Sequence, residues 1–331
     1  MQYNNISIKK PRSITIVMLE VLAALLPAII CMIYFYGINY LFYILNSSLC
    51  AILSEGLILY TRGQNLTNII YRIKDLSAVV TAILLSLCMP PDIPWYLLSL
   101  GTIFAIILAK QLYGGLGQNI FNPAMVGYCI LLISFPAIFT NWPVTENIKN
   151  FNYNFIENNI NYNIYDSISS ATPLETIKSQ TKNDQTIYNI QKNNQTIFSA
   201  WSLINLCYLI GGIYLILRKI ITFIPSLTFL VTLSGLALLL SNINSDIYPD
   251  IIITLFSGST MIAAFFIITD PVTMPANTKS KIIYVFGIAF FTYIIRTFAG
   301  YPDGVAFSVL LMNATVPLLD KINIPKPFGV S

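Results

Sequence analysis

The 331-residue sequence contains no histidine. This absence excludes His-ligated haem, His-containing metal sites, the Ser-His-Asp triad and an imidazole proton relay. The 5 cysteines all lie inside apolar runs, and none of them forms a Cys-x-x-Cys pair. We therefore expect buried free thiols, no bound metal, and neither a disulfide framework nor a metal cluster held by this chain alone.

Charge is also scarce. Charged residues make up 10% of the chain, whereas an ordinary globular domain has about a quarter. Hydrophobic residues make up 56%, and the mean hydropathy is +0.70. This small number of charges cannot cover the surface of a soluble fold of this length. The sequence therefore predicts a protein embedded in a lipid bilayer. The net charge of +4 is small and segregated, which argues against nucleic-acid binding.

The sequence contains many long apolar runs. A bilayer core about 30 Å thick needs about 20 apolar residues per helix. Ten candidate spans cover residues 16–36, 41–60, 75–90, 95–110, 123–140, 200–217, 221–241, 254–270, 281–297 and 303–320. Most Lys and Arg residues lie in alternate connections, as expected for cytoplasmic loops. We therefore predict an all-α polytopic membrane protein with about ten transmembrane helices and both termini in the cytoplasm.

One long polar interruption divides the chain into three parts. Residues 1–140 form the first five-helix half, 141–199 form an Asn-rich loop, and 200–331 form the second five-helix half. The number of spans before the loop places it on the periplasmic side. A loop of this length in a compact membrane protein is often functional.

The two halves share interruptions at matching positions. The third span of each half closes on proline, at residues 90–91 and at 271, and the fifth opens on a glycine-rich turn, at 114–119 and 300–304. Because each half has an odd number of spans, the halves would cross the membrane in opposite directions. The pattern predicts two inverted five-helix repeats with a binding site near the midplane. Alternatively, Gly and Pro are simply frequent in transmembrane helices.

The most informative string lies in the long loop, where residues 166–175 read DSISSATPLE. A structural interpretation is a capping box, in which Thr172, Pro173 and Glu175 begin a helix. A chemical interpretation is that D-x-x-[ST]-x-A-T resembles the sequence at which flavin transferases join FMN to a threonine hydroxyl through a phosphoester. The two are compatible, because the N-terminus of a helix stabilises a phosphate.

Four further strings accompany this one: KQLYGGLGQN at 110–119, FNPAM at 121–125, TDPV at 269–272 and GYPDGVAF at 300–307. Together they resemble the family of membrane proteins that includes the RnfD component of Rnf-type ion-translocating electron transport complexes. The NqrB component of the sodium-translocating NADH:quinone reductase is a more distant member. The resemblance runs from about Arg12 to Lys326, with the motifs in order. One departure is Ser170, which stands where the family usually has glycine before Ala-Thr.

The resemblance implies a flavin-carrying membrane subunit, part of a translocase of the bacterial inner membrane. Such a complex couples electron transfer, between a soluble donor such as ferredoxin or NADH and its acceptor, to cation translocation. The implied cofactor is FMN bound covalently to Thr172, with Asp166, Ser169 and Ala171 completing the attachment motif. The implied partners are the other subunits and a flavin transferase. The distant relative suggests a second, non-covalent flavin, for which the candidate residues are Gly115, Gly117, Asn119 and Asn122.

Ionisable residues inside the spans are the second class of candidates. Charged groups are costly in lipid and usually face a cavity or one another. We expect Glu55, Asp270 and Asp303 to lie along a cation path. Lys110 and Arg296 lie at span ends and are more typical of interfacial side chains or structural ion pairs.

Two other functions can be compared with this one. The glycine-rich turns lack the phosphate-loop pattern, so nucleotide hydrolysis is not expected. A redox-inert, inverted-repeat permease for a small polar solute remains the alternative function. Such a permease would not need a flavin attachment sequence in its periplasmic loop.

Overall fold

The computed structural model describes residues 12–140, 142–143, 169–170, 172–181, 185–301 and 303–322. Most of these residues are helical, as an all-α fold requires. The strands among the described residues form one antiparallel pair of two residues each, β1 (Trp142–Pro143) and β2 (Ser169–Ser170), which joins the start of the long polar segment to its middle.

Six helices are long and apolar enough to cross a membrane, which indicates a multi-pass membrane protein. They are α1 (Ile14–Tyr36), α2 (Asn39–Thr61), α11 (Gln195–Leu217), α12 (Phe223–Ile243), α15 (Thr278–Phe298) and α16 (Val305–Ile322). All six coincide with expected spans, although α11 begins at Gln195 and not at residue 200. Their outward faces carry exposed large apolar side chains, as expected for helices surrounded by lipid.

The other four expected spans contain shorter helices. In the first half these are α4 (Ser77–Cys88), α5 (Trp95–Phe104) with its π-helical continuation η1 (Ala105–Gln111), and α6 (Pro123–Ser134) followed by α7 (Pro136–Thr140). In the second half, the eighth expected span is broken into α13 (Ile251–Phe256), α14 (Thr260–Ile262) and the π-helical η3 (Ala263–Ile267). Ten membrane crossings therefore remain a prediction.

Three short helices lie in connections where the hydropathy pattern predicts only loops. Helix α3 (Leu66–Ile73) follows α2, while α9 (Pro173–Thr181) and α10 (Ile187–Asn193) lie in the C-terminal part of the long polar segment. Hydropathy alone does not reveal them because short helices with polar faces resemble loops in composition. The start of α9 at Pro173 agrees with the capping interpretation of Thr172.

Local chemistry explains where several of the short helices begin. Asn122 accepts a hydrogen bond from the Met125 amide, and Pro123 is the first residue of α6. Asp250 accepts from the Ile253 amide at the start of α13. Side-chain caps of this kind satisfy amide groups that have no partner within the helix.

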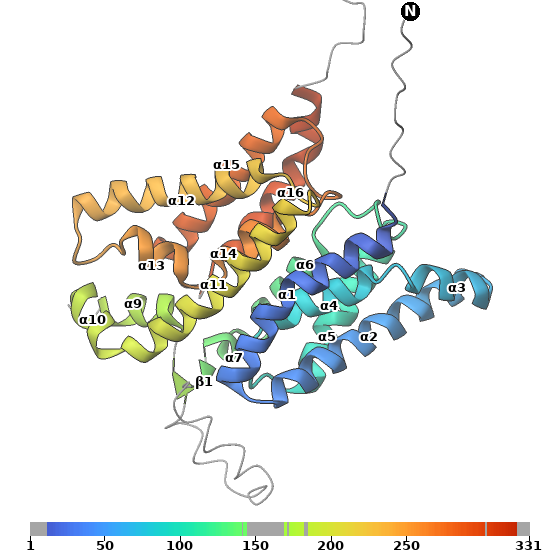
Figure 1. Ribbon diagram of the computed structural model, residues 1–331, viewed down its shortest axis with the longest axis horizontal. Helices are drawn as coiled ribbons and strands as arrows, with labels where there is room; N and C mark the ends of the chain where they lie inside the picture. The colour runs from blue at the N-terminus through green and yellow to red at the C-terminus, as the bar shows by residue number, and fades with distance from the viewer. Residues whose placement is uncertain are drawn as a thin grey trace, which may run out of the picture.

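Helices α1 and α11 lie side by side and join the two halves (Figure 1). Their close approach depends on two glycines of α11. A Cβ atom on Gly211 would lie 2.1 Å from the Ala24 carbonyl oxygen of α1, and one on Gly212 would lie 2.2 Å from a ring carbon of Phe265 in η3. The core therefore runs continuously through both halves.

The two halves share several neighbour relations. Helix α2 packs against α4 and α5, and α12 correspondingly packs against α13, η3 and α15. Helix α5 packs against α6 as α15 packs against α16, and α6 and α16 contact each other across the centre. Figure 1 shows the first group on one side of α1 and α11 and the second group on the other. An internal repeat requires that corresponding helices in the two halves have corresponding neighbours.

Candidate functional site

A pocket lies between the two halves, and Thr172 forms part of its wall. Its walls come from α1, α4 and α6 on one side and from α11, α16 and the break before α14 on the other. The lining is mostly apolar and includes the aromatic residues Tyr128, Phe139, Trp142, Trp201 and Tyr208. A pocket with these walls suits a flat aromatic ligand. We call it the outer pocket, after the predicted side of Thr172.

Thr172 is buried at the start of α9. Its hydroxyl oxygen accepts a hydrogen bond from the Glu175 amide at 3.4 Å, and its carbonyl accepts from the Thr176 amide at 2.8 Å. A capping box has two hydrogen bonds, and the structure contains the one from the Glu175 amide to the Thr172 hydroxyl. The return bond from the Thr172 amide to the Glu175 side chain is not formed among the described residues, and Glu175 Oε2 is buried there without a hydrogen-bond partner. The Thr172 hydroxyl thus sits beside the amide groups of a helix N-terminus, where a phosphate would be stabilised.

The residues of the outer pocket fit a flavin. Aromatic walls would hold the ring system, and the Thr172 hydroxyl would hold the phosphate end. The Tyr208 hydroxyl is buried in this wall and has no hydrogen-bond partner within the part of the chain that the structure describes. A buried phenol without a partner is unfavourable unless a ligand or water supplies one.

The rest of the predicted attachment motif is only partly visible. Asp166 and Ala171 lie outside the described residues. Ser169 pairs with Pro143 through the backbone of β2 and β1, which brings the motif to the end of α7. The roles assigned to these residues therefore remain predictions.

Arg296 and Asp303 form a buried ion pair at the edge of the outer pocket. Arg296 Nε donates to Asp303 Oδ1 at 2.8 Å, and Nη2 donates to Oδ2 at 3.1 Å. The third nitrogen, Nη1, donates to Thr260 Oγ1 at 2.8 Å. This arrangement makes Arg296 a structural partner and not an interfacial side chain, which was one of the two alternatives for it.

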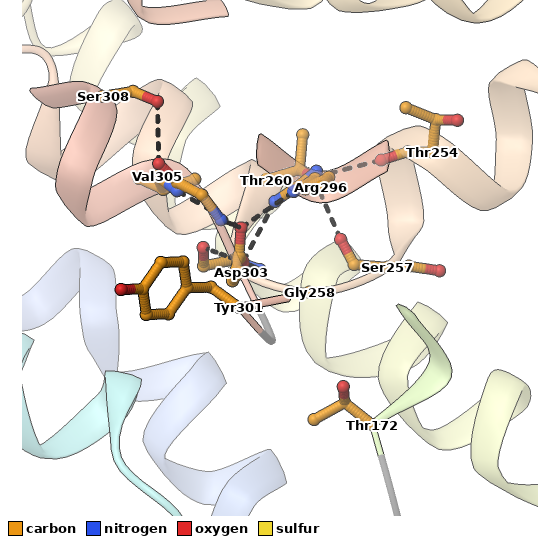
Figure 2. Close-up of polar contacts among 12 residues, drawn as sticks. Thr172, Thr254, Ser257, Gly258, Thr260, Arg296, Tyr301, Asp303, Val305 and Ser308 are labelled. Atoms are coloured by element: carbon orange, nitrogen blue, oxygen red, sulfur yellow. Dashed lines mark hydrogen bonds and ion pairs between the residues drawn. The ribbon is translucent and has the colours of Figure 1, made fainter. Parts of the chain in front are cut away.

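Backbone and hydroxyl donors complete the environment of Asp303. Ser259 donates to Oδ2 from its amide at 3.0 Å and from its hydroxyl at 2.5 Å. The amides of Gly304 and Val305 donate to Oδ1 at 2.6 and 3.3 Å. Figure 2 shows these contacts converging on Asp303, with Thr172 on a separate segment that faces the cluster. Asp303 is thus held as a charged acceptor at the pocket wall.

Gly258 lies where the eighth span breaks, and its position requires glycine. Its φ is +61°, and a Cβ atom there would lie 2.6 Å from Leu174 Cδ1 and 3.0 Å from Asp303 Oδ2. This turn therefore holds α9 close to the ion pair. Sequence reasoning missed Gly258, Ser259 and Thr260, although the polar string Ser-Gly-Ser-Thr inside an apolar run was an available signal.

A second cavity lies at the opposite ends of α1 and α11. It gathers several sequence-predicted residues, because its lining includes Lys110, Asn119, Asn122 and Asp270. Asn119 and Asn122 were candidates for a second flavin and Asp270 for the cation path. Gly115 and Gly117 are not part of the lining, and both have positive φ in the turn that precedes α6. We call this cavity the inner cavity.

Glu55 belongs to a hydrogen-bonded cluster beside the inner cavity. Its Oε1 accepts from Lys110 Nζ at 2.7 Å and from Gln111 Nε2 at 2.6 Å, and both charged side chains are almost fully buried. Lys110 Nζ also donates to Ser77 Oγ at 2.7 Å, and Ser77 in turn donates to Asp75 at 2.6 Å. Glu55 Oε2 is buried without a partner among the described residues. Lys110, like Arg296, is a structural partner.

The three acids predicted for a cation path do not lie together. Glu55 pairs with Lys110, and Asp303 pairs with Arg296 at the other end of the molecule. Asp270 accepts from the Val272 amide at 3.1 Å and from Thr273 Oγ1 at 3.3 Å, and it lines the inner cavity. Two of the three acids are therefore paired with a basic side chain of the protein, whereas Asp270 lines the inner cavity.

Comparisons of the sequence with known proteins identify the family of this chain. The sequence model described as the NQR2, RnfD, RnfE family matches residues 4–329. The D subunit of the ion-translocating oxidoreductase complex of Yersinia pseudotuberculosis serotype O:1b (strain IP 31758) is 40% identical over 339 residues, which cover 96% of this chain and 95% of that protein. The protein of the same description from Escherichia coli O1:K1 / APEC is 41% identical over 335 residues, covering 95% and 94%. This chain therefore belongs to the NQR2, RnfD, RnfE family.

Proposed function

We propose that this chain is the flavin-carrying membrane subunit of a complex that couples electron transfer to cation movement across the bacterial inner membrane. The relatives named above are subunits of ion-translocating oxidoreductase complexes and match nearly the whole chain. The observation that carries the flavin part of the proposal is the position of Thr172. Its hydroxyl lies at a helix N-terminus and in the wall of an aromatic pocket between the halves.

In this proposal Thr172 holds FMN through a phosphoester, and the amide of Glu175 stabilises the phosphate. Tyr128, Trp201 and Tyr208 hold the ring system and keep water out of the pocket. FMN accepts and passes on one or two electrons, which this chain's own side chains cannot do. A flavin transferase would load Thr172, and other subunits would supply and remove the electrons.

The membrane arrangement in the proposal is ten crossings in two inverted five-helix repeats. Both termini are cytoplasmic, and the segment around Thr172 is periplasmic. The matching neighbours of α2 and α12, and of α5 and α15, support the repeat. The alternating positions of Lys and Arg support the orientation.

The inner cavity is the proposed place of a second, non-covalent flavin. Its two Asn side chains support this proposal, and so does Leu116, which lines the cavity from the turn that contains Gly115 and Gly117. Asp270 and Glu55 are the proposed acids of the cation path. An acid inside an apolar span is unfavourable in lipid, so its presence beside a cavity suggests a role in ion movement.

The experiment that separates this proposal from the permease alternative is flavin fluorescence in a denaturing gel. The wild-type band should fluoresce, because a covalent flavin survives denaturation. Thr172→Ala should abolish the fluorescence. Thr181→Ala, a change in the last turn of the same helix, should leave it unchanged and serves as the matched control. A wild-type band without fluorescence would refute covalent attachment and favour the permease.

A further inference from the structure

We propose that the Arg296–Asp303 ion pair sets the reduction potential of the flavin held by Thr172. The negative charge of Asp303 lines the outer pocket and lowers the reduction potential of the flavin. The positive charge of Arg296, which does not line the pocket, partly compensates it. This inference rests on the proposed attachment of FMN to Thr172. It goes further because it assigns a tuning role to two residues that do not attach the flavin.

The geometry places the two charges unequally. Asp303, Ser259 and Thr172 all line the outer pocket. Arg296 instead lines a separate outer hollow, together with Glu175, Lys178 and Tyr293. The Asp303 side chain retains 16% of its accessible surface and the Arg296 side chain only 4%. The carboxylate is thus the member of the pair that lines the outer pocket, and the guanidinium does not line it.

The carboxylate is fixed in both charge and position. Its two oxygens accept from Arg296, from Ser259 and from the backbone amides that begin α16. Hydrogen bonds from a guanidinium and from several amides favour the ionised form. A Cβ atom on Gly258 would lie 3.0 Å from Oδ2, so the tight turn leaves the carboxylate little room to turn away. Figure 2 shows Gly258 beside Asp303.

Reduction of FMN makes the pocket more negative. Two electrons from the electron donor and one proton give the anionic reduced flavin, and a second proton gives the neutral form. A fixed carboxylate in an apolar pocket disfavours the added negative charge, and a nearby guanidinium favours it. The two members of the pair should therefore act on the potential in opposite directions.

This opposition gives a test that a purely structural role would not pass. The purified complex is titrated electrochemically while the visible absorbance of the flavin reports its oxidation state. Asp303→Asn keeps the shape of the side chain and removes the negative charge, so the potential should rise. Arg296→Gln removes the compensating charge, so the potential should fall. Each change should alter the ratio of oxidised to reduced FMN at a fixed potential by about tenfold, which is about 30 mV for a two-electron couple.

Three further variants complete the design. The double variant Asp303→Asn/Arg296→Gln should return close to the wild-type potential. Arg296→Lys keeps the positive charge and should stay near wild type. Asp320→Asn removes a charge at the other end of α16, where Asp320 accepts from the Ala276 amide, and should leave the potential unchanged.

The inference is overturned if Asp303→Asn leaves the potential unchanged or lowers it, or if both single variants shift it in the same direction. The second result would mean that the pair only maintains the shape of the pocket. The flavin content of each variant is measured in the same samples. Wild-type protein without covalent FMN would refute the proposed function as well, whereas FMN present with shifts in one direction refutes only the tuning role.

Discussion

Lys110 and Arg296 occupy corresponding places in the two halves of the protein. Each lies near the C-terminal end of the fourth apolar segment of its half, and each donates a hydrogen bond to the hydroxyl of the first residue of a helix. Lys110 Nζ reaches Ser77 at 2.7 Å, and Arg296 Nη1 reaches Thr260 at 2.8 Å. Each also pairs with a carboxylate, which is the buried Glu55 for Lys110 and the partly buried Asp303 for Arg296.

This correspondence is a chemical observation in favour of the proposed repeat. In both halves a cation from the fourth segment fixes the beginning of a helix in the third segment. The inner cavity lies beside one of these cations, and the outer pocket lies beside the carboxylate paired with the other. Two related arrangements thus form the walls of two cavities at opposite ends of α1 and α11.

The Lys110–Glu55 pair predicts a non-additive effect on stability. Lys110→Met leaves Glu55 buried with an uncompensated charge and should lower the free energy of unfolding by about 3–5 kcal/mol. The double variant Lys110→Met/Glu55→Gln removes both charges and should be more stable than the single variant. Thermal unfolding of the purified complex measures both. Lys74→Met, outside the buried cluster, is the control, and equal losses in the single and double variants would contradict the pairing.

Gly258 predicts a local steric effect. Gly258→Ala adds a Cβ atom at positive φ, 2.6 Å from Leu174, and should lower stability by about 1–3 kcal/mol. Gly235→Ala is the matched control, because a Cβ atom at this position of α12 meets nothing within 4 Å. That change should be neutral or stabilise the protein by about 0.5–1 kcal/mol. Equal effects of the two substitutions on the unfolding temperature would argue against the tight turn.

Glu175 predicts a pH-dependent stability of α9. Burial raises the pKa of its carboxyl to about 7, and the nearby Lys178 opposes this shift. Since the folded pKa lies above the unfolded value of 4.5, the folded state binds more protons between these values. Stability should therefore fall as the pH rises from about 4.5 to about 7. Hydrogen exchange of α9 should show this decline in the wild type and a flatter profile in Glu175→Gln, and identical profiles would contradict the assignment.

We predict that Asp270 is needed to couple cation movement to electron transfer and is not needed for electron transfer itself. Asp270→Asn removes the acid that lines the inner cavity and accepts its hydrogen bonds from neutral groups. In vesicles containing the purified complex, electron transfer should continue while the membrane potential that it generates falls. Asp320→Asn should change neither quantity. A wild-type potential in Asp270→Asn would remove Asp270 from the cation path.

Much of this architecture follows from the sequence because long apolar runs have only one stable form in a bilayer, the helix. The six long helices were predictable for that reason. The break of the eighth span at Gly258 was missed, because hydropathy averages over a window and overlooks a short polar string. The start of α9 was predictable from Thr172 and Pro173 because capping is a local effect.

The ion-pair partners of the charged residues could be identified only from the folded structure. Lys110 and Glu55 are far apart in the chain, and only the packing of α2 against η1 brings them together. The same holds for the outer pocket, whose walls come from both halves. The sequence identified Glu55, Asp270 and Asp303 as unusual but could not distinguish the two acids that form ion pairs from Asp270.

The measurement that tests covalent flavin attachment most directly is the intact mass of the purified chain. The wild-type chain should carry one increment equal to FMN less one water, and Thr172→Ala should lack it. Thr181→Ala should retain it. A wild-type chain at its unmodified mass, or an increment that survives in Thr172→Ala, would contradict the central claim.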